Sequence, residues 1–197
     1  LSLKHHDKIL LTENNSLLNK HKLHDIDNSA LTFNKLSANH LAQNEALLSK
    51  VFAVLVTAHY QTSPNDLKLL LDNENLEILT VSVNNVIAGV ALLLREGGIK
   101  KEGGTPKDHN VGVTTEEINL IKKNRRRLKN QFIPQSLLTH CGEENSFDYT
   151  YLRIMRIAIV PELQNKKIGE RFLLYIESYS KKHGIDFIGT SFGANST

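Results

Sequence analysis

The sequence predicts an α/β protein whose central sheet contains both antiparallel and parallel strands and is flanked by helices. Its antiparallel part is indicated by two β-rich runs, at 76–83 and 86–94, which are joined by Asn84-Asn85. Asparagine tolerates the positive φ angles of a two-residue hairpin turn. Its parallel part is indicated by a third run at 150–160, which an amphipathic helical pattern connects to a fourth run at 185–192.

The first 29 residues are polar, rich in lysine and histidine, and show no sustained hydrophobic period. We interpret them as a linker or the edge of a preceding domain, so that residues 30–197 form the folded domain. No carboxylate or thiol is regularly spaced with their histidines, and we therefore expect no metal site there. These histidines are His5, His6, His21 and His24.

The next segment is expected to form a short strand and two helices. Residues 30–36 alternate in polarity like a strand, and Ser37 is suited to begin a long helix that ends near Tyr60. A second helix is expected from Ser63 to Leu71, because an N-cap serine is followed directly by proline at the first helical position.

The middle of the chain predicts a polar loop after Gly97-Gly98 and then two helical segments. A helix is expected to open at Thr114 or Thr115 over two glutamates and to have a basic end, KKNRRRLK, at 122–129. Pro134 is expected to start a short helical segment, PQSLLTH. The amphipathic helix after the third β-rich run is expected over 167–183, with Gly184 as the residue that ends it. Its inward residues are predicted to be Ile168, Phe172, Ile176 and Tyr179.

Composition narrows the class of protein further. The longest apolar run, 86–94, is far short of the ~20 residues that cross a bilayer. Cys141 is the single cysteine, so no internal disulfide can form and a reducing compartment is expected. The net charge of +3 is uneven, with −2 in residues 1–98 and +5 in 99–197, and the second half is therefore suited to face a polyanion. The chain begins with Leu1 rather than Met, which indicates a piece of a longer protein.

The junction after Val160 is the most informative candidate site. A buried strand there leads into a short turn and a helix start, so backbone N–H groups and the positive end of the helix dipole converge. Lys166 and Lys167 add positive charge, and Gly169 permits close approach to the backbone, which together favour a phosphate ligand. An ordinary β-to-α turn with solvated lysines is the alternative interpretation of this stretch alone.

The element order, the RIAI-x-PELQ run and the following helix together resemble the GNAT acetyltransferase superfamily. The coenzyme A loop of that superfamily reads Q/R-x-x-G-x-G/A, and the corresponding residues here are 164–169, QNKKIG. Gln164 and Gly169 match the first and last positions. Lys167 stands where the superfamily usually has its middle glycine.

Further motifs resemble one family in particular, the bacterial tRNA(Met) cytidine acetyltransferases. The matching blocks cover roughly residues 30–197, and their order along the chain agrees with that family. They are VTAHYQTSPNDLKLLLD at 56–72, LREGG at 94–98, RRLKNQFIPQSLLTH at 126–140, YLRIMRIAIVPELQ at 151–164 and TSFG at 190–193.

This resemblance implies a GNAT acyltransferase fold that is incomplete at its C-terminus. It also implies a cytoplasmic bacterial enzyme that transfers acetyl from acetyl-CoA to the exocyclic amine of the wobble cytidine of elongator tRNA(Met). The family couples this reaction to ATP through a helicase-like ATPase domain upstream, and ATP and Mg are expected only there, because the chain contains no G-x-x-x-x-G-K-[ST]. The acetyl-CoA contacts implied are Ile157, Ala158, Ile159, Gln164, Asn165, Lys166, Lys167, Ile168, Gly169 and Glu170.

His59 is the candidate catalytic residue, because it matches a family motif position and a histidine can accept the proton that leaves the attacking amine. A helix-terminal histidine that satisfies carbonyl groups is the structural alternative. His140 and Glu96 are weaker candidates for the same role.

A basic run between Ile121 and Lys129 has six positive residues and no acidic one. A solvated surface is the usual explanation of such a run, but tRNA phosphates are its expected partner if the resemblance holds. The candidate RNA contacts are Arg125, Arg126, Arg127 and Lys129. The family usually has R-R-P-R-G where this chain has RRLKN at 126–130, so that Asn130 replaces a glycine.

Two other functions fit the same sequence. The first is a GNAT N-acetyltransferase that acts on a different amine and needs no upstream ATPase. The second is an RNA-binding module whose coenzyme site has decayed, which the replacements at Lys167 and Asn130 support.

Overall fold

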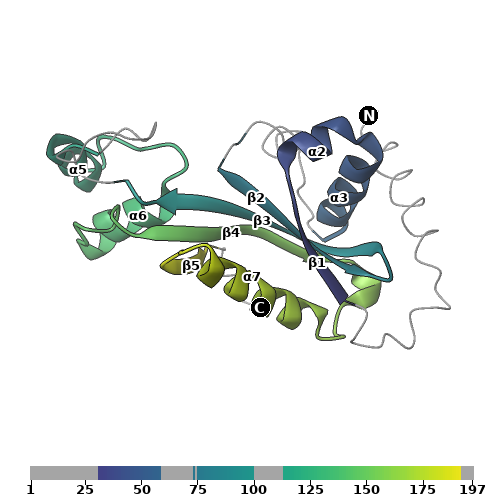
Figure 1. The fold of residues 1–197 in the computed structure, drawn as a ribbon. Helices are drawn as coiled ribbons and strands as arrows, with labels where there is room; N and C mark the ends of the chain where they lie inside the picture. Colours follow the sequence, from purple (N-terminus) through teal and green to yellow (C-terminus); the bar gives the residue numbers. More distant parts are fainter. Residues whose placement is uncertain (1–30, 59–72, 74, 100–112, 192–197) are drawn as a thin grey trace. The chain divides into compact units, whose positions relative to one another are not determined.

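The computed structural model describes residues 31–58, 73, 75–99 and 113–191. The strands of a five-stranded sheet pair in the order β1-β2-β3-β4-β5 (Figure 1). β1 and β2 are antiparallel, whereas β4 and β5 are parallel, which confirms the predicted mixed sheet. The strands are β1 (Leu31–Leu36), β2 (Leu76–Val83), β3 (Val86–Gly97), β4 (Thr150–Ile159) and β5 (Phe187–Thr190).

Helices and short helical turns separate these strands, except at the β2–β3 hairpin. The helices are α2 (Ala38–Gln43), α3 (Glu45–Ala58), α5 (Thr115–Lys122), α6 (Phe132–Ser136) and α7 (Ile168–Lys182). A π-helix, η3 (Leu137–Cys141), follows α6, and a 3-10 turn, η4 (Pro161–Leu163), follows β4. In the part of the chain that the structure describes, no helix is long and apolar enough to cross a membrane.

The chain divides into two compact units. The first unit contains the chain up to Leu93 together with Met155–Ile176, and the second contains Leu94–Ile154 together with the residues from Glu177 onward. β3, β4 and α7 each contribute residues to both units. The segment 1–30 and the helix predicted at 63–71 lie outside the described residues, as do 100–112 and 192–197.

The first unit is built on β1, β2 and the beginning of β3. Every residue of β2 from Glu77 to Val83 is buried, so side chains on both faces of this strand are covered. Phe33 of β1 stacks on two rings of α7, with its centroid 4.7 Å from Tyr175 and 6.1 Å from Phe172. The β2–β3 hairpin turns at Asn84 and Asn85, whose φ angles of 49° and 65° confirm the predicted turn.

The long helix predicted from Ser37 is wrong in one respect, because two helices occupy that segment. Ser37 does cap the first of them, since its side chain accepts a hydrogen bond from His40 N at 3.1 Å. Asn44 then leaves the helical conformation, and its Oδ1 accepts from Leu47 N at 3.0 Å. An asparagine side chain that caps the backbone competes with helix continuation, and it therefore starts α3 as a new helix.

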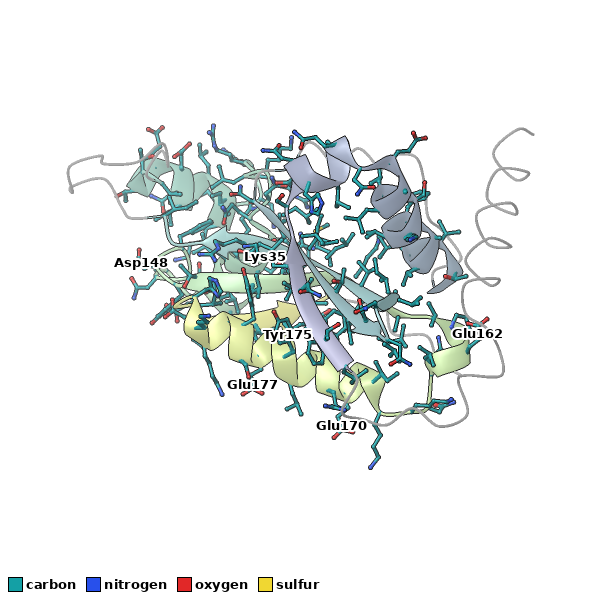
Figure 2. All side chains as sticks on the ribbon, turned by 45° about the vertical axis from the view of Figure 1, so that its right-hand side comes forward. Lys35, Asp148, Glu162, Glu170, Tyr175 and Glu177 are labelled. Carbon is teal, nitrogen blue, oxygen red and sulfur yellow. The ribbon has the colours of Figure 1, made fainter. Side chains whose placement is uncertain are left out.

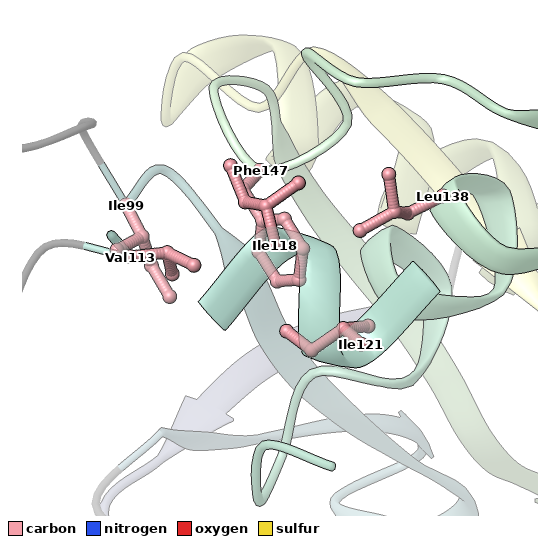
Figure 3. Packing of buried hydrophobic residues seen from close by; sticks show 6 residues of the cluster. All are labelled: Ile99, Val113, Ile118, Ile121, Leu138 and Phe147. Atoms are coloured by element: carbon pink, nitrogen blue, oxygen red, sulfur yellow. The ribbon is translucent and has the colours of Figure 1, made fainter. Parts of the chain in front are cut away.

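The second unit has its own small core, which is shown in Figure 3. α5 begins at the predicted place, with a reciprocal cap in which Thr114 accepts from Glu117 N and the Glu117 side chain accepts from Thr114 N. Its inward residues pack with side chains from η3 and the flanking segments. The cluster consists of Ile99, Val113, Ile118, Ile121, Leu138 and Phe147.

Three predicted elements of the second unit differ from the structure. α5 ends at Lys122, so the basic residues 125–129 lie in a loop and not on a helix end. α6 begins at Phe132, two residues before the predicted start at Pro134, because Glu96 Oε2 accepts a hydrogen bond from Ile133 N at 2.7 Å. The last strand is short, since β5 is limited to Phe187–Thr190 in the described part of the chain.

The last helix agrees closely with its prediction. α7 spans Ile168–Lys182, and the four predicted inward residues are all buried. Gly184 ends it in the left-handed conformation, with φ +64°. Cys141, at the end of η3, is exposed and unpaired.

Candidate functional site

The end of β4 forms the first part of the candidate site. β5 pairs with β4 only from Tyr151 to Ile154, so Met155–Ile159 extend beyond that pairing in the described residues. Beyond the strand, Val160 N donates to Ala88 O at 2.9 Å. Gly89 permits this close approach, because a Cβ built there would lie 2.9 Å from Ala158 O and 2.8 Å from Val81 Cγ1. The chain therefore leaves the sheet directly after Val160.

The turn after β4 is held against the strand that precedes it. Leu163 of η4 is completely buried and anchors the turn, while Pro161 occupies its start. The Gln164 side chain returns to the strand, with Nε2 donating to Ile159 O at 3.1 Å. This hydrogen bond connects the first predicted loop residue to the last predicted strand residue, so the two predicted segments are in direct contact.

Two residues of the loop adopt the left-handed backbone conformation. Asn165 has φ 61° and Lys167 has φ 60°. This conformation costs a residue with a Cβ about 1–2 kcal/mol, and glycine avoids that cost. Lys167 thus keeps the backbone shape that the expected glycine would favour, although it is a lysine.

α7 starts immediately after Lys167. As at any helix start, the N–H groups of its first turn have no carbonyl partner within the helix. Ile168 is buried and fixes the direction of the helix, while a Cβ built on Gly169 would meet only Ile159 Cγ1, at 3.8 Å. The fold itself leaves room for a side chain at Gly169, so close packing within the protein does not require glycine there.

The charges around this loop are mixed, with a basic centre. Lys166 is half-buried and Lys167 is exposed, directly before the positive end of the helix dipole. Two exposed carboxylates lie beside them in sequence, Glu162 on η4 and Glu170 in the first turn of α7 (Figure 2). This arrangement can hold a phosphate-bearing ligand, because it combines the bare backbone at Gly169 with the N–H groups of the helix start and two lysines.

The three candidate catalytic residues differ in their surroundings, and one of them is not described by the structure. His59 lies outside the described residues. Glu96 is completely buried, and both of its carboxylate oxygens are occupied, with Oε1 2.5 Å from Arg153 Nε and Oε2 bonded to Ile133 N. Both oxygens of the third candidate, Glu96, are therefore engaged by groups of the protein itself. His140 is exposed on the π-helix η3.

The basic run belongs to the second unit, and all four candidate RNA contacts are exposed. They are Arg125, Arg126, Arg127 and Lys129. Arg126 forms an ion pair with Glu117, at 2.6 Å. Gln135 holds the loop, because its Oε1 accepts from Leu128 N at 2.6 Å and its Nε2 donates to Leu128 O at 2.8 Å. Asn130, like Lys167, replaces an expected glycine and has a positive φ, 58°.

A pocket beside the basic run was not predicted. Its volume is about 200 Å³. Residues from the basic loop, α6 and η3 line it, among them Asn124, Arg126, Arg127, Phe132, Thr139 and His140. Phe132 was the one sequence signal, as an aromatic residue close to the basic run, whereas the π-helix that presents Thr139 and His140 has no recognisable sequence pattern.

Comparison with known proteins decides the family. A sequence model of the family GNAT acetyltransferase 2 matches residues 50–190. This chain belongs to the GNAT acetyltransferase 2 family. The match includes β4, the Gln164–Glu170 loop and the start of α7, so the predicted acetyl-CoA loop lies inside the matched residues.

Two relatives are similar in sequence to this chain over most of its length. A tRNA(Met) cytidine acetyltransferase TmcA from Nitrosococcus halophilus is 34% identical over 160 residues, which cover 81% of this chain and 20% of that protein. The TmcA of Vibrio cholerae is 32% identical over 165 residues, covering 84% of this chain and 21% of that protein. The chain thus spans about a fifth of the length of the relatives it matches.

A solved structure is also similar to this member of the family. The GNAT family acetyltransferase of Staphylococcus aureus is 16% identical and has a TM-score of 0.46, covering 85% of this chain and 95% of that chain.

Proposed function

We propose that this chain is the acetyl-transferring domain of a tRNA(Met) cytidine acetyltransferase. In the proposed reaction the exocyclic amine of the wobble cytidine forms a bond to the acetyl carbon of acetyl-CoA, and the carbon–sulfur bond breaks. The amine loses a proton and the released thiolate of coenzyme A gains one. Relatives named for this activity, together with the GNAT family match, support the assignment.

The observation that carries the proposal is the loop from Gln164 to Glu170. It combines a turn fixed to the strand by the Gln164–Ile159 hydrogen bond with a helix start at which Gly169 leaves the backbone bare. Glycine in a helix costs about 1 kcal/mol relative to alanine, and the fold has room for alanine here. A ligand that approaches the backbone closely gives a reason for glycine at this position.

The residues present fit acetyl-CoA in distinct ways. Backbone groups of Ile157, Ala158 and Ile159 are proposed to hold the pantetheine amides and polarise the thioester carbonyl. Loop residues 164–170 would hold the phosphates, through backbone N–H groups and the charges of Lys166 and Lys167. When bound, acetyl-CoA supplies the activated acetyl group.

The tRNA is proposed to contact the basic run through Arg125, Arg126, Arg127 and Lys129. All four side chains are exposed, and they lie in a loop that Gln135 binds by two hydrogen bonds to Leu128. Such contacts neutralise RNA phosphates, so the affinity should decrease steeply as the salt concentration rises.

His59 is proposed to accept the proton that leaves the amine. A histidine with a pKa near 6.5 suits proton transfer at neutral pH. In a full-length protein, His59→Ala is expected to slow acetylation about 100-fold or more while sparing acetyl-CoA affinity. Near-normal turnover of the variant would remove His59 from this role. ATP coupling, with Mg, is proposed to depend on an ATPase region outside these 197 residues.

Calorimetric titration of the 197-residue chain with acetyl-CoA, alongside a melting scan, tests the coenzyme part of the proposal. One-to-one saturable binding is expected, and acetyl-CoA at about 100 times its Kd should add about 2.7 kcal/mol to the stability. Gly169→Trp should abolish this binding, because the ring would occupy the space beside the bare backbone.

Leu174→Trp is the matched control, since Leu174 lies on the same helix and is 57% exposed. This variant should bind acetyl-CoA like the unmodified chain. A cooperatively melting chain that gives neither binding heat nor a melting shift would overturn the proposed coenzyme site.

A further inference from the structure

The pocket beside the basic run has the chemistry of a site for one nucleotide. We propose that it binds a single unstacked nucleotide of RNA, with the base against the Phe132 ring and a phosphate on Arg127. This inference rests on the proposed function, because RNA is the substrate there, and it adds a specific recognition site to the general contacts of the basic run.

The size of the pocket limits what it can hold. Its volume of about 200 Å³ is below the roughly 300–1,000 Å³ of sites that enclose drug-sized ligands. A whole coenzyme is therefore too large for it, whereas a base or a sugar-phosphate group fits the scale. The pocket lies within the second unit, and its lining comes from the end of α5 and the loop after it, from α6 and from η3.

Phe132 presents an exposed aromatic ring at the pocket. Its side chain is 48% exposed at the start of α6, although burying an aromatic ring stabilises a fold. The guanidinium carbon of Arg153 lies 5.2 Å from the centre of the ring. Arg153 is in turn held by the buried carboxylate of Glu96, at 2.5 Å. The ring is thus positioned before any ligand arrives, and single-stranded bases stack on such exposed rings.

Positive charge is available at the same pocket. Arg126 is partly neutralised by Glu117, at 2.6 Å. Arg127 is exposed, and no ion pair of Arg127 occurs among the described residues. Its guanidinium is therefore the better placed of the two to form charge-assisted hydrogen bonds with a phosphate.

The rest of the lining supplies hydrogen-bonding groups. Asn124 has a positive φ of 55°, while Thr139 and His140 lie on the π-helix η3. Single π-turns occur frequently at functional sites, because they shift side chains out of the ordinary helical positions. An acidic peptide would need only the positive charge, whereas the exposed aromatic ring beside an arginine favours an RNA base with its phosphate.

Fluorescence anisotropy with a labelled single-stranded 12-nucleotide RNA tests this inference on the 197-residue chain. Phe132→Leu keeps an apolar side chain of similar bulk but removes the ring, and it should weaken binding about 5- to 150-fold. Phe132→Tyr should retain binding, because it keeps the ring. Arg127→Gln should reduce the slope of log K against log salt by about 0.7, the value for one single-strand phosphate contact.

Phe187→Leu is the matched control, since Phe187 is also exposed (52%) in the second unit and does not line the pocket. RNA binding by this variant should equal that of the unmodified chain. If the unmodified chain binds RNA and Phe132→Leu binds it equally well, the pocket inference is overturned while RNA binding by the basic run stands.

Two further outcomes separate this inference from the proposed function. If the unmodified chain binds no RNA, both the pocket inference and the RNA part of the proposed function are overturned, while the acetyl-CoA titration still reports on the coenzyme part. If unlabelled acetyl-CoA displaces the RNA competitively and Phe132→Leu weakens acetyl-CoA binding, the pocket belongs to a coenzyme nucleotide and the RNA inference is overturned.

Discussion

A Cβ built on Gly169 would lie 3.8 Å from Cγ1 of Ile159, which is an ordinary van der Waals separation. The strand end and the helix start are therefore close enough to define one surface, yet they leave space for at least a methyl group. Gly89 presents the opposite case in the same unit, because its Cβ would lie 2.9 Å from Ala158 O. The packing of the protein therefore requires glycine at position 89 but not at position 169.

Replacing Gly169 with alanine should therefore stabilise the chain while weakening its coenzyme binding. The free energy of unfolding is expected to rise by about 0.5–1 kcal/mol, because alanine favours a helix over glycine and meets no clash. Acetyl-CoA affinity should decrease, since a methyl group then covers the bare backbone. Urea unfolding and calorimetric titration measure the two effects.

The matched control is the same substitution at Gly89, which should lower the free energy of unfolding by about 1–3 kcal/mol through overpacking. A Gly169→Ala variant that is less stable and binds acetyl-CoA normally would contradict our account of Gly169.

Lys167→Gly should stabilise the chain by about 0.5 kcal/mol. The left-handed backbone at Lys167, with φ 60°, costs about 1–2 kcal/mol in a residue with a Cβ, and the greater freedom of glycine in the unfolded chain offsets about 0.4–1 kcal/mol of the gain. Lys166→Gly removes the same charge at a residue that is not among the described positive-φ positions, so it should destabilise the chain. Urea midpoints that shift in the same direction for both variants would refute the assigned strain.

Glu96→Gln should lower the free energy of unfolding by about 3 kcal/mol, because it leaves the mostly buried Arg153 guanidinium without its charge partner. Glu77→Gln is the comparison, since Glu77 pairs at 3.4 Å with a half-exposed Lys35 and should cost less than about 1 kcal/mol. Denaturant unfolding of both variants measures the difference. Equal losses in the free energy of unfolding would show that burial does not make the Glu96–Arg153 pair more important for stability than the Glu77–Lys35 pair.

The stability of the chain should depend on Asp186 in a defined pH range. The backbone N–H of Thr150, followed by its hydroxyl, donates to Asp186 and holds the pKa of that carboxyl below its usual range. A lowered carboxyl pKa contributes stability above the unfolded pKa of about 3.9, and the contribution is lost as the pH falls through the folded pKa.

Asp186→Asn should therefore be less stable than the unmodified chain at pH 7, and this difference should shrink as the pH falls below about 4. Urea midpoints of both proteins across this range provide the measurement. A difference that stays constant from neutral to acid pH would show that ionisation of Asp186 has no part in it.

Local sequence patterns predicted much of this structure correctly. The Asn84-Asn85 turn, the helix start at Thr114/Thr115 and the inward face of α7 were all confirmed. Each depends on residues within a few positions of one another, so that local backbone preferences and hydrophobic period are sufficient to specify them.

Two of the errors arise from hydrogen bonds that the order of residues in the sequence does not show. α6 starts early because Glu96, 37 residues away, accepts from Ile133 N. The loop of basic residues replaces the expected helix end, and Gln135 holds it by bonds to Leu128. The error at Asn44 is different, because its side chain caps the following helix through a hydrogen bond from a residue only three positions away. An asparagine at this position could have predicted the helix break from the sequence.

The sequence by itself determined the mixed α/β class, the family and the position of the Gln164–Glu170 loop, because periodicity and motifs are local properties of the chain. Tertiary structure alone decided that Lys167 would adopt a left-handed backbone, that Glu96 would be a buried partner of Arg153, and that Phe132 would line a pocket with Arg127. These features depend on contacts between residues that are distant in the sequence. Such contacts form only when the chain folds, because a charge that becomes buried must be paired with a partner.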